Sequence, residues 1–153
     1  MTDKADKVHP VVDLAEKLES AKNGSLVLDG MIEACVRGDE FVKWDGAGAV
    51  IRHGSGIWKG NISHIPAREV RPRSVNLEAA MGMLPRGWRL THLGQEKPDS
   101  QWLAQIAYCD DDAIEYDGLS FVSRPAPTAA LAVCRAIIEV YKLTSRAREE
   151  MGV

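Results

Sequence analysis

The chain has 153 residues, of which 45% are hydrophobic and 27% charged, and its formal net charge is −3. This length and composition fit one globular domain, and they exclude a largely disordered protein because enough apolar side chains are present to offset chain entropy. No apolar run approaches the roughly 18 residues of a transmembrane helix, and the charged first residues predict no signal peptide. We expect a flexible arm at 1–10, a single domain at 11–147 and a frayed C-terminus at 148–153.

The three cysteines, Cys35, Cys109 and Cys134, are an odd number and show no CxxC spacing. This pattern argues against a disulfide framework and favours a reduced, cytoplasmic setting. Residues 110–117 hold five acidic residues and no basic one. We interpret that segment as a solvated acidic turn, with a contact surface for a basic partner as the alternative.

Two helices are predicted at the N-terminal end. Val11–Lys22 carries Leu14 and Leu18 at helical spacing, and Asn23-Gly24 is typical of a helix end. Ser25 is then a suitable N-cap for a second helix over Leu26–Arg37.

Short β-like runs follow over 40–63. Phe41–Trp44, Ala49–Arg52 and Ile57–Lys59 are separated by glycine-rich turns, which predicts a meander of two tight hairpins. Residues 64–75 contain Pro66 and Pro72, so we expect an extended or looped segment there.

The second half begins with a short helix that Asn76 caps and Pro85 ends. Alternating runs over 88–93 and 102–108 then predict strands. Ala113–Tyr116 and Leu119–Ser123 are a further pair of β-like runs, and Asp117-Gly118 between them predicts a hairpin turn. The final helix begins after Thr128 and extends to about Arg146. The order is α-α-β-β-β-α-β-β-β-α, which predicts an α+β fold with an antiparallel sheet flanked by helices in an α/β/α-type sandwich.

Three sequence blocks carry a family resemblance. Asp13–Glu19 with Gly24–Asp29 is similar to the start of a group of small phage proteins. Ser74–Met81 with Leu84–Trp88 resembles that group's "SLDAAL…LVPEGW" element, and Ala126–Cys134 resembles its closing "ATPALALC" helix. In order and spacing the chain resembles the phage ABA-sandwich domain family.

The resemblance implies a phage or prophage origin and a fold of helices flanking an antiparallel sheet. It supplies no catalytic residues, because its blocks are helix caps and core positions. Asn76 stands where the family pattern prefers serine, although asparagine also caps helices. The glycine-rich 45–60 stretch has no counterpart in the pattern, so it is the part that we expect to be particular to this protein.

Several segments match the sequence motif of a known binding site only in part. Gly46-Ala47-Gly48 begins like a dinucleotide fingerprint, but Ile51 occupies the third glycine position and no helix follows. Counting from Asp110, the fifth, sixth and twelfth positions do not match an EF-hand loop. The histidines lack HxH or HExxH spacing, although a zinc site could assemble from His53, His64 and His92. We therefore expect no metal, no cofactor and no catalytic residue.

Two sets of residues are candidates for binding. Arg68, Arg71 and Arg73 form a basic segment suited to phosphates or carboxylates, with ordinary surface salt bridges as the alternative. Trp44 and Trp58 lie in short glycine-flanked runs and are candidate partner anchors, with core packing as the alternative.

These observations favour a non-enzymatic phage- or prophage-encoded accessory protein, in the host bacterial cytoplasm, that binds a protein partner such as a host or defence component. One alternative is a nucleic-acid-associated protein that uses Arg68, Arg71 and Arg73. The other is a small-molecule or metal-dependent enzyme in which distant histidine and acidic residues converge.

Overall fold

Four α-helices and six β-strands are found in this computed structural model over the residues that it describes, which are 10–95, 97–98, 100–108, 120–122 and 125–150. In chain order the elements are α1 (Pro10–Ser20), α2 (Leu26–Arg37), β1 (Glu40–Trp44), β2 (Gly48–Arg52), β3 (Ile62–Pro66), the 3₁₀ turn η2 (Ala67–Glu69), α3 (Leu77–Met81), β4 (Trp88–Gln95), β5 (Trp102–Tyr108), β6 (Ser120–Val122) and α4 (Ala129–Glu150). The α+β class and the predicted order of helices and strands are confirmed.

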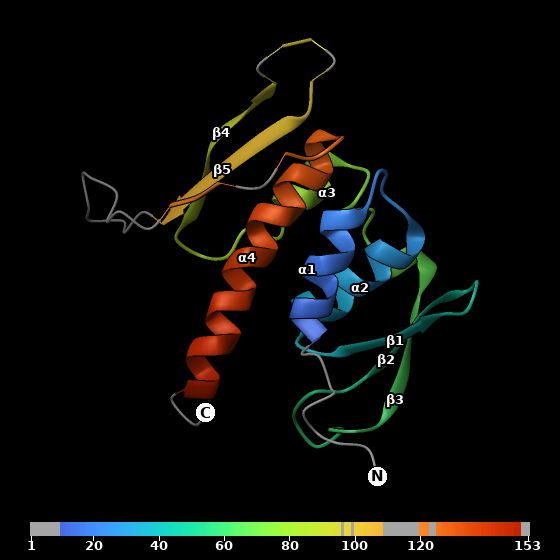
Figure 1. The fold of residues 1–153 in the computed structure, drawn as a ribbon. Helices are drawn as coiled ribbons and strands as arrows, with labels where there is room; N and C mark the ends of the chain where they lie inside the picture. Colours follow the sequence, from blue (N-terminus) through green and yellow to red (C-terminus); the bar gives the residue numbers. More distant parts are fainter. Residues whose placement is uncertain (1–9, 96, 99, 109–119, 123–124, 151–153) are drawn as a thin grey trace.

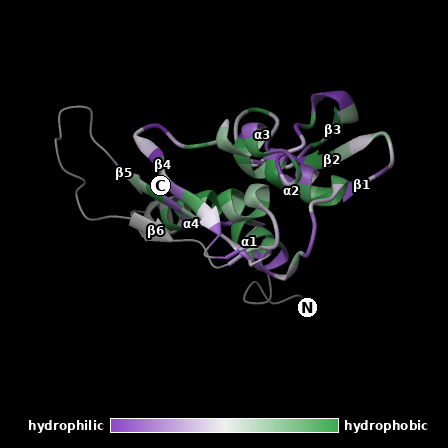
Figure 2. Cartoon of the chain, turned by 90° about the horizontal axis from the view of Figure 1, so that it is seen from above, coloured by the Kyte–Doolittle hydropathy of each residue, from purple (hydrophilic) through white to green (hydrophobic). Residues whose placement is uncertain are grey.

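The strands form two separate antiparallel sheets. Sheet A has the order β1-β2-β3 and sheet B the order β4-β5-β6. The helices lie between the sheets, with sheet A against α2 and sheet B against α4 (Figures 1 and 2). The single sheet that we expected between helix layers is therefore wrong in its layering, because the strands divide between both sides of a helical layer.

The sequence determines the bounds of the second helix in a direct way. Ser25 has an extended backbone, and its Oγ accepts a hydrogen bond from the Leu28 amide at 3.1 Å. At the other end Gly38 has a φ of 79°, a left-handed conformation that glycine adopts at low cost. The helix therefore spans the predicted residues 26–37 and directs Ile32 and Ala34 into the protein.

The third strand differs from the prediction. Residues 57–60 form a turn, with positive φ angles at Gly56 and Gly60, and β3 begins at Ile62. A nine-residue stretch, 53–61, consequently joins β2 to β3 in place of a tight turn. The 64–75 segment is also more regular than expected, because it completes β3 and forms η2. The strand predicted at 113–116 and the Asp117-Gly118 hairpin lie outside the described residues.

Two apolar clusters hold these layers together. The larger one joins α1, α2, α4 and sheet B, and it includes the buried residues Leu14, Leu18, Ile32, Ala104, Ile106, Leu131, Ile137 and Ile138. The smaller one lies between α2 and sheet A and contains the buried residues Ala34, Ala49, Ile51 and Ile65. Alternate residues of β2, Ala49 and Ile51, supply the smaller cluster, and in the described part of the chain α2 is the α-helix that packs against sheet A.

Candidate functional site

The predicted arginine surface is divided by the fold. Arg68 lies exposed on η2 and Arg71 lies exposed just after it. Arg73 is buried, with only 7% of its side chain accessible. The three arginines therefore do not form one basic surface.

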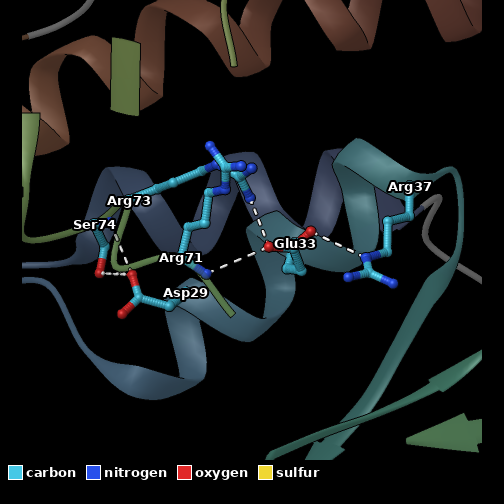
Figure 3. Close-up of polar contacts among 6 residues, drawn as sticks. All are labelled: Asp29, Glu33, Arg37, Arg71, Arg73 and Ser74. Carbon is cyan, nitrogen blue, oxygen red and sulfur yellow. Dashed lines mark hydrogen bonds and ion pairs between the residues drawn. The ribbon is translucent and has the colours of Figure 1, made fainter. Parts of the chain in front are cut away.

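Arg73 belongs to a polar network centred on Glu33 of α2 (Figure 3). Arg73 Nη1 donates to Glu33 Oε1 at 3.0 Å, and the Arg71 backbone amide donates to the same oxygen at 3.4 Å. Arg37 Nε donates to the other oxygen, Oε2, at 3.0 Å. Both Glu33 oxygens are thus bonded, and the charge of Arg73 is compensated inside the protein.

A second carboxylate, Asp29, holds the same segment one helical turn earlier (Figure 3). Its Oδ1 accepts hydrogen bonds from the Ser74 amide at 2.8 Å and from the Ser74 hydroxyl at 2.6 Å. The Cys134 thiol of α4 also donates to the Arg73 carbonyl at 3.2 Å. Residues 71–74 are therefore fixed between α2 and α4.

The two carboxyl groups respond oppositely to this environment. Burial dominates at Asp29 and raises its pKa above 3.8, despite the hydrogen bonds from Ser74. Burial also opposes ionisation at Glu33, but it is outweighed by the hydrogen bond from Arg37, the charge of Arg73, the backbone hydrogen bond from Arg71 and the charge of Arg37, which lower the pKa of Glu33 below 4.5. Glu33 is therefore the carboxylate that the network stabilises in its charged form, which indicates a structural role for Arg73.

Among the described residues, the large apolar side chain with the greatest exposure, Ile57, lies on the 53–61 loop. Ile57 is 92% exposed and Trp58 is 61% exposed. The loop is held by backbone hydrogen bonds: Gly60 N donates to His53 O at 2.8 Å, and Asn61 N donates to Trp58 O at 2.8 Å. Ile62, which directly follows the loop and is the first residue of β3, is 53% exposed. We call Ile57, Trp58 and Ile62 the hairpin-tip patch.

Trp44 has a different environment from Trp58. It is half-buried at the end of β1 and packs against the smaller apolar cluster, together with Phe41 and Val70. Trp44 is therefore a core-packing residue, whereas Trp58 has the exposure that a partner anchor needs.

The three described histidines are dispersed. His92 lies on β4 of sheet B, and His64 lies on β3 of sheet A, where its Nε2 is 3.1 Å from Asp45 Oδ2. His53 follows β2 and lies near Asp39 and Ser63. Among the residues that the structure describes, no group of three or more metal-ligating side chains comes together.

His53 lies between a hydroxyl group and a carboxylate group. Its Nε2 lies 2.7 Å from Ser63 Oγ, and its Nδ1 lies 3.8 Å from Asp39 Oδ1. Ser63 pairs with the buried Ile51 across β2 and β3, so it faces the α2 side of sheet A. The side chain of His53 is 26% exposed, which leaves this arrangement open to solvent.

A groove of about 320 Å³ separates α1, α2 and β1. Leu14, Met31 and Phe41 contribute apolar lining, and Cys35 also lies on it. Burial raises the pKa of the Cys35 thiol to about 11, so the thiol is protonated at neutral pH and is a poor nucleophile. The groove is near the lower limit of ligand-pocket size, and it contains no activated group.

No protein-family model, curated protein or solved structure matches the chain. Within the described part of the chain, no helix combines the length and apolar character needed to cross a bilayer. The acidic 110–117 segment and Cys109 lie outside the described residues.

Two features of this region were not predicted from the sequence. Asp39, His53 and Ser63 are separated by 14 and 10 positions and match no motif, so only the strand register brings them together. Ile57 was assigned to a strand, although the flanking Gly56 and Gly60 were a signal that a turn would expose it.

Proposed function

We propose that this chain is a phage- or prophage-encoded accessory protein that binds a protein partner through the hairpin-tip patch. The exposure of Ile57 and Trp58 on a backbone-bonded loop is the observation that supports this proposal. The phage origin rests on the three sequence blocks that resemble the ABA-sandwich family.

Physical arguments favour contact through this loop. Folding removes little of the apolar surface of Ile57 from water, because this side chain remains 92% exposed. That surface is therefore available for burial against a partner. Tryptophan is among the residues that contribute most to binding energy at protein interfaces. The backbone bonds of the loop reduce the conformational entropy that association would cost.

The charges beside the patch indicate the chemistry of the partner. Lys59 is exposed next to Trp58, and Arg52 lies at the end of β2, 3.3 Å from Glu40. Because Arg52 is already paired with Glu40, an apolar pocket with an acidic residue opposite Lys59 would complement this surface. The fold removes one arginine from the alternative nucleic-acid surface, because Arg73 is paired with Glu33 in the interior.

The test uses a partner captured from bacterial lysate by the full chain and then purified. Calorimetric titration of that partner compares wild type with Trp58→Ala and Ile57→Ser. Each substitution is expected to weaken binding by about 30-fold, the effect of losing an interface hot spot of roughly 2 kcal/mol.

Leu26→Ser is the matched control. Leu26 is also 61% exposed, but it lies at the start of α2 and does not belong to the hairpin-tip patch. Its substitution is expected to leave the affinity unchanged. Recovery of no stoichiometric partner, or equal weakening by Leu26→Ser and Trp58→Ala, would overturn the proposal.

A further inference from the structure

We infer that Asp39, His53 and Ser63 form a nucleophilic site that acts on activated carboxylic esters. This inference is independent of the hairpin-tip patch, because none of its residues belongs to that patch. It rests on three side chains from three separate positions in the chain that meet in the order carboxylate, imidazole and hydroxyl.

The first step concerns the proton on the imidazole. Asp39 Oδ1 lies on the Nδ1 side of His53 at 3.8 Å, which is longer than a hydrogen bond but close enough for charge attraction. A carboxylate on that side favours the tautomer with its hydrogen on Nδ1. Nε2 then has a free lone pair toward Ser63 Oγ at 2.7 Å, so the hydroxyl donates to it.

The second step concerns the rigidity of this alignment. The Asp39 amide donates to the Ala34 carbonyl at the end of α2, and Asp39 Oδ1 accepts from the Gly54 amide at 3.0 Å. The His53 amide donates to the Asn61 carbonyl at 2.9 Å, which continues the pairing of β2 and β3. Secondary structure therefore holds all three residues, as nucleophile and base geometry requires.

The reaction then follows from this geometry. Ser63 Oγ attacks the ester carbonyl carbon while His53 Nε2 accepts the hydroxyl proton, and the alcohol leaves with that proton. Water next attacks the acyl-serine, with its proton passing through His53 back to Ser63 Oγ. The sum is ester plus water giving acid plus alcohol. His53 and Ser63 are the catalytic residues, and Asp39 is a positioning residue.

The substrate class is limited to esters with good leaving groups. Donors to the developing oxyanion contribute about 10²- to 10³-fold in serine hydrolases. Among the described residues, His53 is the hydrogen-bond partner of the Ser63 side chain, so the proposed reaction relies on the leaving group and not on such donors. Amide bonds, which need more assistance, are therefore not expected as substrates.

The test treats the full folded chain with diisopropyl fluorophosphate, whose phosphorus bonds to serine Oγ as fluoride leaves. Intact mass and peptide mapping are expected to place one adduct on Ser63. Hydrolysis of p-nitrophenyl acetate is expected to be lost in Ser63→Ala, and His53→Gln is expected to slow both reactions by about 10²- to 10⁴-fold. Ser55→Ala, an exposed serine of the same loop, is the matched control and is expected to react like wild type.

Asp39→Asn tests the positioning role separately. It is expected to slow labelling by about tenfold or more, and Asp39→Glu is expected to recover part of the rate. Nitrogen-15 NMR of the His53 ring gives a signature that a purely structural role would not move. The Nδ1–H tautomer is expected to dominate in wild type and to decrease in Asp39→Asn.

Two outcomes would overturn the inference. One is wild-type protein that gains no Ser63 adduct under excess reagent. The other is ester hydrolysis that persists in Ser63→Ala. Either result would leave the His53–Ser63 contact as a hydrogen bond that only supports the hairpin, and neither would affect the partner-binding test.

Discussion

The two sheets are of similar size but are attached to the helices in different ways. Sheet B packs against α4, and Ala104 and Ile106 of its central strand are fully buried in the larger apolar cluster. Sheet A packs against α2 through a much smaller cluster, whose largest buried members are Ile51 and Ile65. Less apolar area is therefore removed from water at sheet A, and burial stabilises it less.

Polar contacts supply much of the remaining attachment of sheet A. The chain that leaves β3 is bound to α2 by Glu33 through Arg73 and by Asp29 through Ser74. The hairpin-tip patch and the His53–Ser63 pair also belong to this lightly covered sheet. The comparison suggests that the sheet with the smaller core is the one that is free to present functional groups.

The largest expected effect tests the polar attachment. Glu33→Ala leaves the buried guanidinium of Arg73 without its partner and is expected to lower the free energy of unfolding by about 3–5 kcal/mol. Urea unfolding followed by circular dichroism measures it. The double variant Glu33→Leu/Arg73→Met, which removes both charges, is expected to recover most of the loss. A double variant as unstable as Glu33→Ala would show that the ion pair is not the cause.

The next effect compares the two apolar clusters. Ile137→Ala in α4 and Ile51→Ala in β2 each remove a buried side chain and are expected to cost about 2–5 kcal/mol, with Ile137 nearer the upper value. Native-state hydrogen exchange distinguishes them. Ile51→Ala is expected to accelerate exchange chiefly in β1–β3, whereas Ile137→Ala accelerates it throughout. Uniform acceleration by both would contradict the difference between the sheets.

A smaller effect concerns pH. The pKa of Glu33 is lowered, so its ionisation stabilises the fold above pH 4.5, and this contribution is lost as pH falls through the lowered pKa. At neutral pH, wild type is expected to be more stable than Glu33→Gln by about 1.5–3 kcal/mol, the contribution of hydrogen bonds to a charged group. Urea titrations are expected to show this difference decreasing as pH falls through the lowered pKa of Glu33.

Asp29 is expected to give the opposite pH dependence of stability in the same urea titrations. Its pKa is raised, so its contribution is fully present below pH 3.8 and is lost as pH rises through the raised pKa. Wild type is therefore expected to gain stability relative to Asp29→Asn as pH falls. Parallel pH dependences of Asp29→Asn and Glu33→Gln would contradict the assigned environments.

Local sequence patterns were sufficient for the helices and insufficient for the site. Leu14 and Leu18 lie on the buried face that their spacing predicts, because helix packing depends on that periodicity. The strand at 62–66 was missed because the third strand was predicted at Ile57–Lys59 and residues 64–75 were expected to be extended or looped. Pro66 is tolerated since β3 is an edge strand, where a missing amide hydrogen need not break a ladder bond.

The partners of charged residues could not be predicted from the sequence. Arg73 and Glu33 are 40 positions apart, and neither residue carries a local sign that the other will neutralise it in the interior. The same holds for the contact of His53 with Ser63, which requires the register of β2 with β3. Tertiary pairing, which single-sequence patterns do not encode, determines which polar residues become a site.

The smallest expected effect compares the helix caps on the two sides. Ser25 Oγ accepts from the Leu28 amide of α2 at 3.1 Å, and Asn76 Oδ1 accepts from the Ala79 amide of α3 at 2.9 Å. Ser25→Ala and Asn76→Ala are each expected to lower the free energy of unfolding by about 1 kcal/mol. Because α2 supports sheet A and α3 packs on α4, Ser25→Ala is expected to speed hydrogen exchange in β1–β3, whereas Asn76→Ala is expected to leave the exchange of those amides unchanged.

Ser25→Asp, which can also cap the helix, is the control and is expected to retain wild-type exchange. Faster exchange of β1–β3 in Asn76→Ala would show that the two sheets are not independently attached.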